Sequence, residues 1–212
     1  METSKSKPEK HQAIFISGGE VFDNKEDFYT YLKRVEYNPY QKRRTRKDRL
    51  ERSLSWRFDS FIPKIPNKQR ADYKARKIRF EKFFPYINPS QNTKIILAGH
   101  SLWWIFLTKY LSENKFPKHI DQLHLIAPVF DNEWLTDPLW NFEFNPDNLQ
   151  NIRKQSKKIF FYHSEDDPAV PITHTEKYLQ YLPEAKFYKF KDRWHFNQPA
   201  FMEILQNINA NL

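Results

Sequence analysis

The sequence predicts an α/β protein built on a mostly parallel, twisted sheet with helices on both faces. Two observations predict this class. Short apolar runs, typical of strands covered on both faces, alternate with helical patterns from one end of the chain to the other. At 212 residues the chain is also long enough to bury a single large core without disulfide or metal support.

The expected strands follow one another along the chain. The first, residues 12–17 (QAIFIS), runs into a turn at Gly18 and Gly19, and the second, residues 57–62, is stopped by Pro63. The later strands are expected where apolar and β-branched residues form short continuous runs, at residues 94–98 (KIILA), 123–127, 158–162 and 185–190.

Helical patterns lie between the strands. Pro85 is expected to end the second helix, and Thr173 with Glu176 forms a capping-box pattern at the start of the fourth. The third helix is almost wholly apolar and should therefore be internal. Helices are expected over residues 27–34, 72–84, 102–111, 173–182 and 198–208, with a further helical spacing at Leu50 and Leu54.

The pattern indicates one domain. Residues 1–11 are polar and are expected to form a tail, and residues 12–212 are expected to form a single unit. Neither an internal repeat nor a low-complexity linker interrupts the alternation of strands and helices.

The composition excludes several classes of chemistry. The chain has no cysteine, which excludes disulfide frameworks, thiolate metal sites and a cysteine nucleophile. No apolar run approaches the ~20 residues that cross a bilayer, and the N-terminus does not resemble a signal peptide, so we expect a cytoplasmic protein without a membrane partner. Phosphate-binding glycine motifs and metal-ligand spacings are absent, so no cofactor is expected.

The net charge of +9 is concentrated in one part of the chain. Residues 33–82 carry 18 basic and 6 acidic side chains, whereas the other 162 residues are slightly acidic. The basic run at residues 41–49 is compatible with binding phosphates of a nucleic acid. Aromatic stacking residues are not interleaved with these charges, so we expect a solvated helix face instead of a nucleic-acid site.

Ser101 is the candidate nucleophile. It follows the expected strand at residues 94–98 as part of Gly99-His100-Ser101-Leu102 and directly precedes the apolar helix. A serine on a tight turn from strand to helix is typical of a nucleophile elbow, in which the turn exposes the hydroxyl at the edge of the sheet. A serine hydroxyl is a weak nucleophile and needs a general base held beside it.

Asp167 and His195 are the candidate acid and base. Each follows a later expected strand, and the chain order Ser, Asp, His is the order found in α/β-hydrolases. All three residues should meet at one edge, because the carboxyl ends of parallel strands lie together. Glu165 and Asp166 stand beside Asp167, and Asp131 ends an earlier strand, so the acid has these alternatives.

Several motifs in the same order resemble the small retinoblastoma-binding-protein-nine-like serine hydrolases. They are IFISGGEVF, IPNKQ, GHSL, IAPVFD, HSEDDPAVP and DRWHFN, spread over residues 12–208. The resemblance implies an α/β-hydrolase with a minimal lid, with Ser101 as nucleophile, Asp167 as acid and His195 as base. It also implies an oxyanion hole formed by the backbone N–H groups of Leu102 and Gly19.

This resemblance implies hydrolysis of a small ester or amide through an acyl-enzyme. The expected partner is a small acyl substrate, and the sequence carries no signal for an oligomeric state. The alternatives are a catalytically dead binding protein on the same fold and a basic module associated with nucleic acid.

Three tryptophans depart from the family pattern. Trp103, Trp104 and Trp194 stand where the family has glycine, and the whole chain has 3 glycines where about 15 are expected. An indole at position 103 or 104 is expected to crowd the approach of helix to strand. The chain is therefore either a decayed relative, or its tryptophans represent UGA codons that some bacterial lineages read as glycine.

Overall fold

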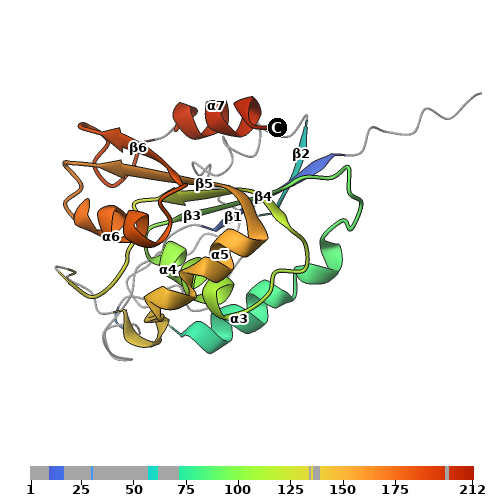
Figure 1. Cartoon of the computed structure of the whole chain (residues 1–212), viewed down its shortest axis with the longest axis horizontal. Coiled ribbons are helices and arrows are strands. Elements are labelled where there is room, and N and C mark those ends of the chain that lie inside the picture. The colour runs from blue at the N-terminus through green and yellow to red at the C-terminus, as the bar shows by residue number, and fades with distance from the viewer. Residues whose placement is uncertain are drawn as a thin grey trace, which may run out of the picture.

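The structure is a computed structural model that describes residues 10–16, 30, 57–61, 72–133, 135, 139–198 and 201–212. In this part of the chain a single sheet runs through the centre of the molecule (Figure 1). Its six strands are β1 (His11–Ile16), β2 (Phe58–Phe61), β3 (Ile95–His100), β4 (Ile120–Ile126), β5 (Ser156–Ser164) and β6 (Lys186–Phe190).

All neighbouring strands of the sheet are parallel. The spatial order is β2-β1-β3-β4-β5-β6, so the chain moves outward from β1 to β2 and then in the opposite direction from β3 to β6. The carboxyl ends of β3, β5 and β6 consequently lie at the same edge of the sheet. The turning point of the strand order lies between β1 and β3, where open sheets of this kind form a crevice.

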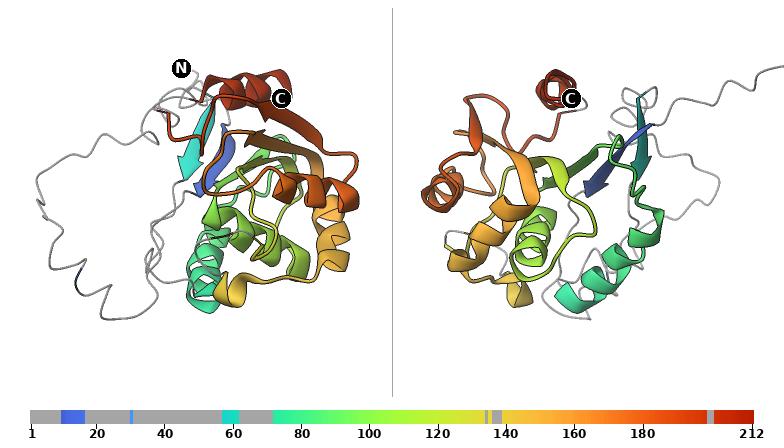
Figure 2. Two further views of the ribbon diagram at one scale, coloured as in Figure 1. Left: turned by 90° about the vertical axis from the view of Figure 1, so that its left-hand side faces the viewer. Right: turned by 45° about the vertical axis from the view of Figure 1, so that its right-hand side comes forward.

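Helices cover both faces of the sheet, as Figure 2 shows. Among the described helices, α7 (Met202–Ala210) lies on one face by itself, and four others lie on the opposite face. These four are α3 (Tyr73–Glu81), α4 (Leu102–Glu113), α5 (Gln150–Gln155) and α6 (Thr173–Tyr181). Short 3₁₀ turns, η1 (Phe84–Tyr86), η2 (Trp140–Phe142) and η3 (Pro146–Leu149), complete the connections.

Two apolar cores follow from the alternation of side chains along the strands. In β3, Ile95 and Leu97 point toward α4 and the larger core, whereas Ile96 and Ala98 point toward α7 and the smaller one. α4 lies within the larger core, where Ile105, Phe106 and Leu107 are fully buried, as its apolar sequence predicts. Burial on both faces explains why β3 reads as a continuous apolar run.

The described elements confirm the predicted fold class, with differences at helix ends. α3 ends at Glu81, and Pro85 lies inside η1 instead of ending the helix. Thr173 is the first residue of α6 and makes no capping hydrogen bond, so the predicted capping box does not form. α7 begins at Met202, later than expected, and α5 was not predicted because its sequence, QNIRKQ, has almost no apolar pattern.

Other predicted features lie outside the described residues. These are the turn at Gly18 and Gly19, the helix at residues 27–34 apart from residue 30, the helical spacing at Leu50 and Leu54 and the basic run at residues 41–49. In the part of the chain that the structure describes, no helix is both long and apolar enough to cross a membrane.

Candidate active site

Ser101 occupies a strained turn between β3 and α4. The strand ends at His100, the helix begins at Leu102, and Ser101 between them has φ 56° and ψ −135°. Residues other than glycine rarely adopt this backbone conformation, and it persists only where the surrounding structure enforces it. Here the Ser101 N–H donates to the carbonyl of Ile126 on β4, and the Ser101 carbonyl accepts from Trp104 N–H at 2.7 Å. The turn predicted from the sequence is therefore formed.

His195 reaches Ser101 from the loop that follows β6. Its Nε2 lies 2.7 Å from Ser101 Oγ, although the two residues are 94 positions apart in the chain. The other ring nitrogen, Nδ1, lies 2.8 Å from Oδ2 and 3.0 Å from Oδ1 of Asp167. Because a carboxylate can only accept, the Nδ1–H tautomer follows, and Nε2 is left to accept the proton of the serine hydroxyl.

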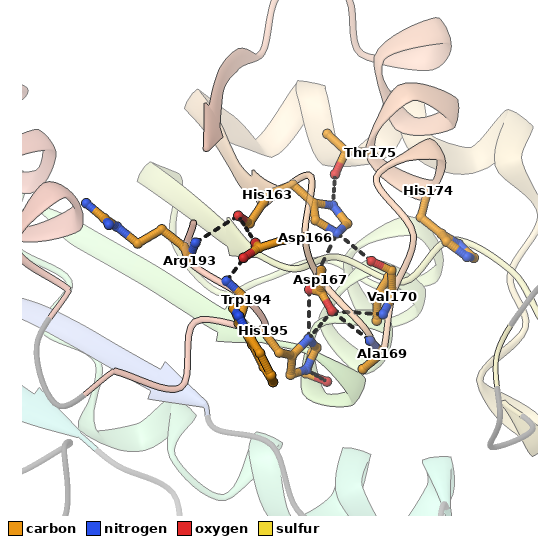
Figure 3. A network of polar contacts seen from close by, with 12 residues as sticks. His163, Asp166, Asp167, Ala169, Val170, His174, Thr175, Arg193, Trp194 and His195 are labelled. Atoms are coloured by element: carbon orange, nitrogen blue, oxygen red, sulfur yellow. Dashed lines mark hydrogen bonds and ion pairs between the residues drawn. The ribbon is translucent and has the colours of Figure 1, made fainter. Parts of the chain in front are cut away.

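Asp167 lies in the loop after β5, where it faces His195 (Figure 3). Its side chain is fully buried. Its Oδ1 accepts the backbone N–H groups of Ala169 and Val170 at 2.9 and 3.0 Å. Burial alone would raise the pKa of the Asp167 carboxyl, but the contacts with His195 and the two backbone donors outweigh it and lower the pKa below its ordinary value. The carboxylate is thus held ionised beneath the imidazole.

A second histidine supports Asp167 from behind. His163, the penultimate residue of β5, is fully buried, and its Nε2 lies 2.8 Å from the Val170 carbonyl and 3.6 Å from Asp167 Oδ2. Its Nδ1 lies 2.6 Å from the Thr175 hydroxyl. The carbonyl can only accept, so His163 carries its proton on Nε2. Burial lowers the pKa of His163, which keeps this ring neutral beside the carboxylate.

The alternative acids are occupied elsewhere. Glu165 pairs with Lys189 at 2.6 Å, and Asp166 accepts the backbone N–H of Trp194 at 2.9 Å. Asp131 pairs with Lys177, in the middle of α6, at 2.5 Å. Among the four carboxylates considered from the sequence, the structure brings Asp167 to the imidazole of His195.

Of the two expected oxyanion donors, Leu102 and Gly19, the structure describes Leu102. Leu102 is the first residue of α4, and the N–H groups at the start of a helix have no partner within the helix. The positive end of the helix dipole also lies at this point, directly beside Ser101. Gly19, the second expected donor, lies outside the described residues.

The structure places the side chain of Trp104 inside the larger core. Its side chain is 1% exposed, lies among the core residues and packs edge-on to Tyr178 at a centroid distance of 6.4 Å. Gly99 makes room for it, because a Cβ at that position would meet the indole at 3.1 Å. The absence of a side chain at Gly99 thus provides the space that the indole of Trp104 occupies. The side chain of Trp103 is not among those described.

Trp194 has a backbone conformation that favours glycine. Its φ is 47°, in the left-handed region, and its side chain is 63% exposed immediately before His195. The glycine that the family pattern places at this position would adopt this conformation without strain.

Sequence reasoning missed two further histidine contacts. His100 Nε2 lies 2.8 Å from the backbone carbonyl of His195, and the two rings lie 4.8 Å apart. His163 is buried directly behind Asp167, with 3.6 Å between His163 Nε2 and Asp167 Oδ2. The position of His100 beside the nucleophile was the available signal for the first, and the sequence had no comparable signal for the second.

The arrangement can perform nucleophilic acyl transfer. A hydroxyl, a neutral imidazole and a buried carboxylate lie in one line of hydrogen bonds, which is the geometry that activates a serine. In the described part of the chain no group of three histidine or acidic side chains is placed to hold a metal ion.

Comparisons with known proteins agree with this architecture. Neither a protein-family model nor a curated protein sequence matches the chain significantly. The structure of the ydeN gene product from B. subtilis matches with a TM-score of 0.66 and 15% identity, over 94% of this chain and 98% of that one. The esterase domain of a Rhodothermus marinus protein gives a TM-score of 0.58 at 16% identity, over 95% and 86% of the two chains. Zea mays acyl-protein thioesterase 2 gives 0.52 at 12%, over 96% and 95%.

These identities are low, so the likeness concerns the fold. Together with the six-stranded parallel sheet, it shows that the chain has the α/β-hydrolase fold. The prediction of fold class is thereby confirmed, and the function is argued from the site itself.

Proposed function

We propose that this protein is a serine hydrolase that cleaves small esters or amides through an acyl-enzyme. The observation that carries the proposal is the continuous line of contacts from Asp167 through His195 to Ser101, with 2.8 Å and 2.7 Å between the bonded atoms. The solved structures of similar fold include proteins described as an esterase domain and an acyl-protein thioesterase, which supports the same reaction class. The motifs additionally favour kinship with the retinoblastoma-binding-protein-nine-like hydrolases.

In this mechanism His195 Nε2 accepts the hydroxyl proton while Ser101 Oγ attacks the substrate carbonyl carbon. The resulting oxyanion receives hydrogen bonds from the N–H groups proposed at Leu102 and Gly19. His195 then protonates the leaving alcohol or amine, and the acyl group remains on Ser101. Water attacks this ester with the same base, which releases the carboxylic acid and restores the serine. Asp167 holds the imidazole tautomer and stabilises the imidazolium throughout.

Labelling with a fluorophosphonate probe tests this function directly, because the probe forms a bond with an activated serine. The protein should label and hydrolyse a short-chain p-nitrophenyl ester, and Ser101→Ala should lose both while keeping its thermal midpoint. The matched control is Ser112→Ala, which changes a buried serine of α4 far along the helix from the elbow. Labelling that persists in Ser101→Ala would contradict the proposal.

A non-catalytic binding protein on the same fold is the second candidate. Trp194 favours it, because a large exposed side chain with a strained backbone precedes the proposed base directly. Under this alternative the intact chain would fold, resist the probe, and remain unlabelled after Trp194→Gly.

A further inference from the structure

His195 stands in a turn with unusual backbone geometry on both of its sides. Trp194 has φ 47° and Phe196 has φ 51°, so two side-chain-bearing residues in left-handed conformations flank the imidazole. Such conformations are unfavourable for residues other than glycine and return to ordinary ones unless other contacts hold them. The direction in which His195 points depends on these two residues.

Two polar side chains at and just after the end of β5 accept hydrogen bonds from the backbone N–H groups that open this turn. Asp166 Oδ1 accepts the Trp194 N–H at 2.9 Å and the Ser164 hydroxyl at 2.5 Å. Ser164 Oγ in turn accepts the Arg193 N–H at 2.9 Å. Figure 3 shows Asp166 directed at the backbone of Trp194, while Asp167 next to it is directed at the imidazole.

Other contacts hold the carbonyl side and the end of the turn. His100 lies against the His195 carbonyl, and the Phe196 N–H and the Gln198 side chain both donate to the Arg193 carbonyl, at 2.9 and 2.6 Å. None of these bonds involves the amide of Trp194, which is the group that must keep its orientation if φ of that residue is to stay positive.

We propose that Asp166 is the positioning residue of the catalytic base: it anchors the strained turn in which His195 reaches Ser101 and Asp167 together. The inference rests on the proposed function, since it assigns His195 as the base. The two consecutive carboxylates then have separate roles: Asp167 binds the imidazole of His195, and Asp166 binds the backbone N–H of the residue before it. Both belong to one short loop, so the base is placed relative to its acid by neighbouring residues.

Kinetic comparison of three single variants tests the anchor. Asp166→Ala removes the acceptor and should lower kcat by ~100-fold with KM within ~3-fold, because a base displaced by about 1 Å loses its alignment without loss of substrate binding. Asp166→Asn keeps a side-chain oxygen for the Trp194 N–H and should retain kcat within ~5-fold. Glu165→Gln, the matched control, changes the neighbouring exposed carboxylate and should leave kcat unchanged.

A double variant tests whether the anchor acts against backbone strain. Glycine adopts a positive φ at no steric cost, so Trp194→Gly should make the turn less dependent on Asp166. In the Trp194→Gly background, Asp166→Ala should therefore cost ~10-fold or less in kcat. An equal loss in both backgrounds, or an Asp166→Asn variant as impaired as Asp166→Ala, would overturn the proposal.

Nitrogen-15 NMR of histidine-labelled protein separates this inference from the proposed function. The Nδ1–H proton of His195 should give a strongly downfield resonance through its bond to Asp167, lost in Asp166→Ala and kept in Asp166→Asn. This readout does not require turnover. A protein that does not react with the fluorophosphonate probe but shows these resonances would therefore reject the hydrolase and keep the anchor. If Asp166→Ala does not fold, Ser164→Ala removes the acceptor for Arg193 N–H and should weaken the same resonance. An unchanged resonance in Asp166→Ala, or in Ser164→Ala where Asp166→Ala does not fold, would reject the anchor.

Discussion

Three consecutive acidic residues follow β5, and each has a different environment. Glu165 faces solvent and pairs with Lys189, Asp166 holds backbone, and Asp167 is buried against His195. The sequence predicts Asp167 as the acid, with Glu165, Asp166 and the earlier Asp131 as alternatives, because the strand and the residue order are both readable. Which of them serves the base depends on the turn that follows, where Ala169 and Val170 turn their N–H groups back to Asp167.

The first prediction compares two carboxylates. Asp167→Asn should lower kcat by ~10³-fold or more, because an amide at this site favours the wrong imidazole tautomer and cannot stabilise the imidazolium. Asp131→Asn removes part of a half-exposed ion pair with Lys177 and should leave kcat within ~3-fold. Steady-state ester hydrolysis with matched circular dichroism spectra measures both. A larger loss at Asp131 than at Asp167 would move the acid to the loop that follows β4.

The second prediction concerns the tryptophans at positions 103, 104 and 194. We expect peptides of the protein isolated from its own organism to carry glycine at these positions, as the glycine deficit of the chain and the positive φ of Trp194 both indicate. Peptide mass spectrometry decides this, because the two residues differ greatly in mass. The triple glycine variant should label faster with the probe than the chain as written. Tryptophan in the native peptides would reject the codon explanation and favour the binding protein.

At the scale of elements, prediction from sequence succeeds where burial dominates and is weaker where polar contacts decide. β3 and α4 could be predicted because both lie in the core, and their continuous apolar sequences indicate buried elements. α5 was missed because its placement comes from contacts made elsewhere, such as the Asn151 side chain donating to the Ser112 carbonyl. α7 begins at Met202 instead of residue 198, whereas α6 (Thr173–Tyr181) agrees with its predicted range to within one residue.

A buried polar network lies under α7 on the smaller core. His124 of β4 is fully buried, with Nδ1 2.9 Å from the Tyr162 hydroxyl and Nε2 3.0 Å from Gln122 Oε1. Gln122 donates to the Ile208 carbonyl of α7, and Asn207 of α7 donates to the Tyr162 hydroxyl. These bonds tie the helix to the sheet through a neutral imidazole, and burial lowers the pKa of His124 to about 3.

The third prediction follows from that pKa. His124 has an ordinary pKa of about 6.5 in the unfolded chain, so below this pH the unfolded state binds a proton that the folded state excludes. The stability that His124 contributes is thus present above pH 6.5 and falls by up to about 1.4 kcal/mol per pH unit toward pH 3. Urea unfolding measured at several pH values should show this slope.

The matched variant is His124→Phe, which keeps the stacking on Phe160. It should be less stable by about 1–3 kcal/mol at neutral pH, because Gln122 Oε1 and the Tyr162 hydroxyl each lose a partner. Its free energy of unfolding should, however, depend less on pH below 6.5 than that of the original chain. Equal pH slopes in the two proteins would show that His124 is not the group responsible.

At the scale of the whole molecule, the strand order places the chemistry. β3 lies beside β1 at the turning point of the sheet, and Ser101 follows β3 directly. β5 and β6 bring Asp167 and His195 to the same edge, so residues from three loops converge at one end of the sheet. The parallel sheet was predictable from the alternation of elements. The spatial order was not, because it depends on which strands pair across long connections.

The last prediction concerns the uneven charge of the molecule. The excess of basic residues lies within residues 33–82, and its densest part is residues 41–49, a run without interleaved aromatic side chains. Such a run attracts DNA through its phosphates alone, and log–log plots of affinity against salt then fall with a slope near −0.9 per neutralised phosphate on duplex DNA. We therefore expect weak binding at low salt that disappears near physiological salt, measured by fluorescence anisotropy with labelled duplex and single-stranded DNA. Neutralising Arg43, Arg44, Arg46 and Lys47 together should remove the weak binding and leave ester hydrolysis intact, because we expect this run to be a solvated helix face that contributes to neither the elbow nor the base. Submicromolar affinity that persists at physiological salt and is lost in the neutralised variant would instead identify the run as a nucleic-acid site, and would make the hydrolase fold its scaffold.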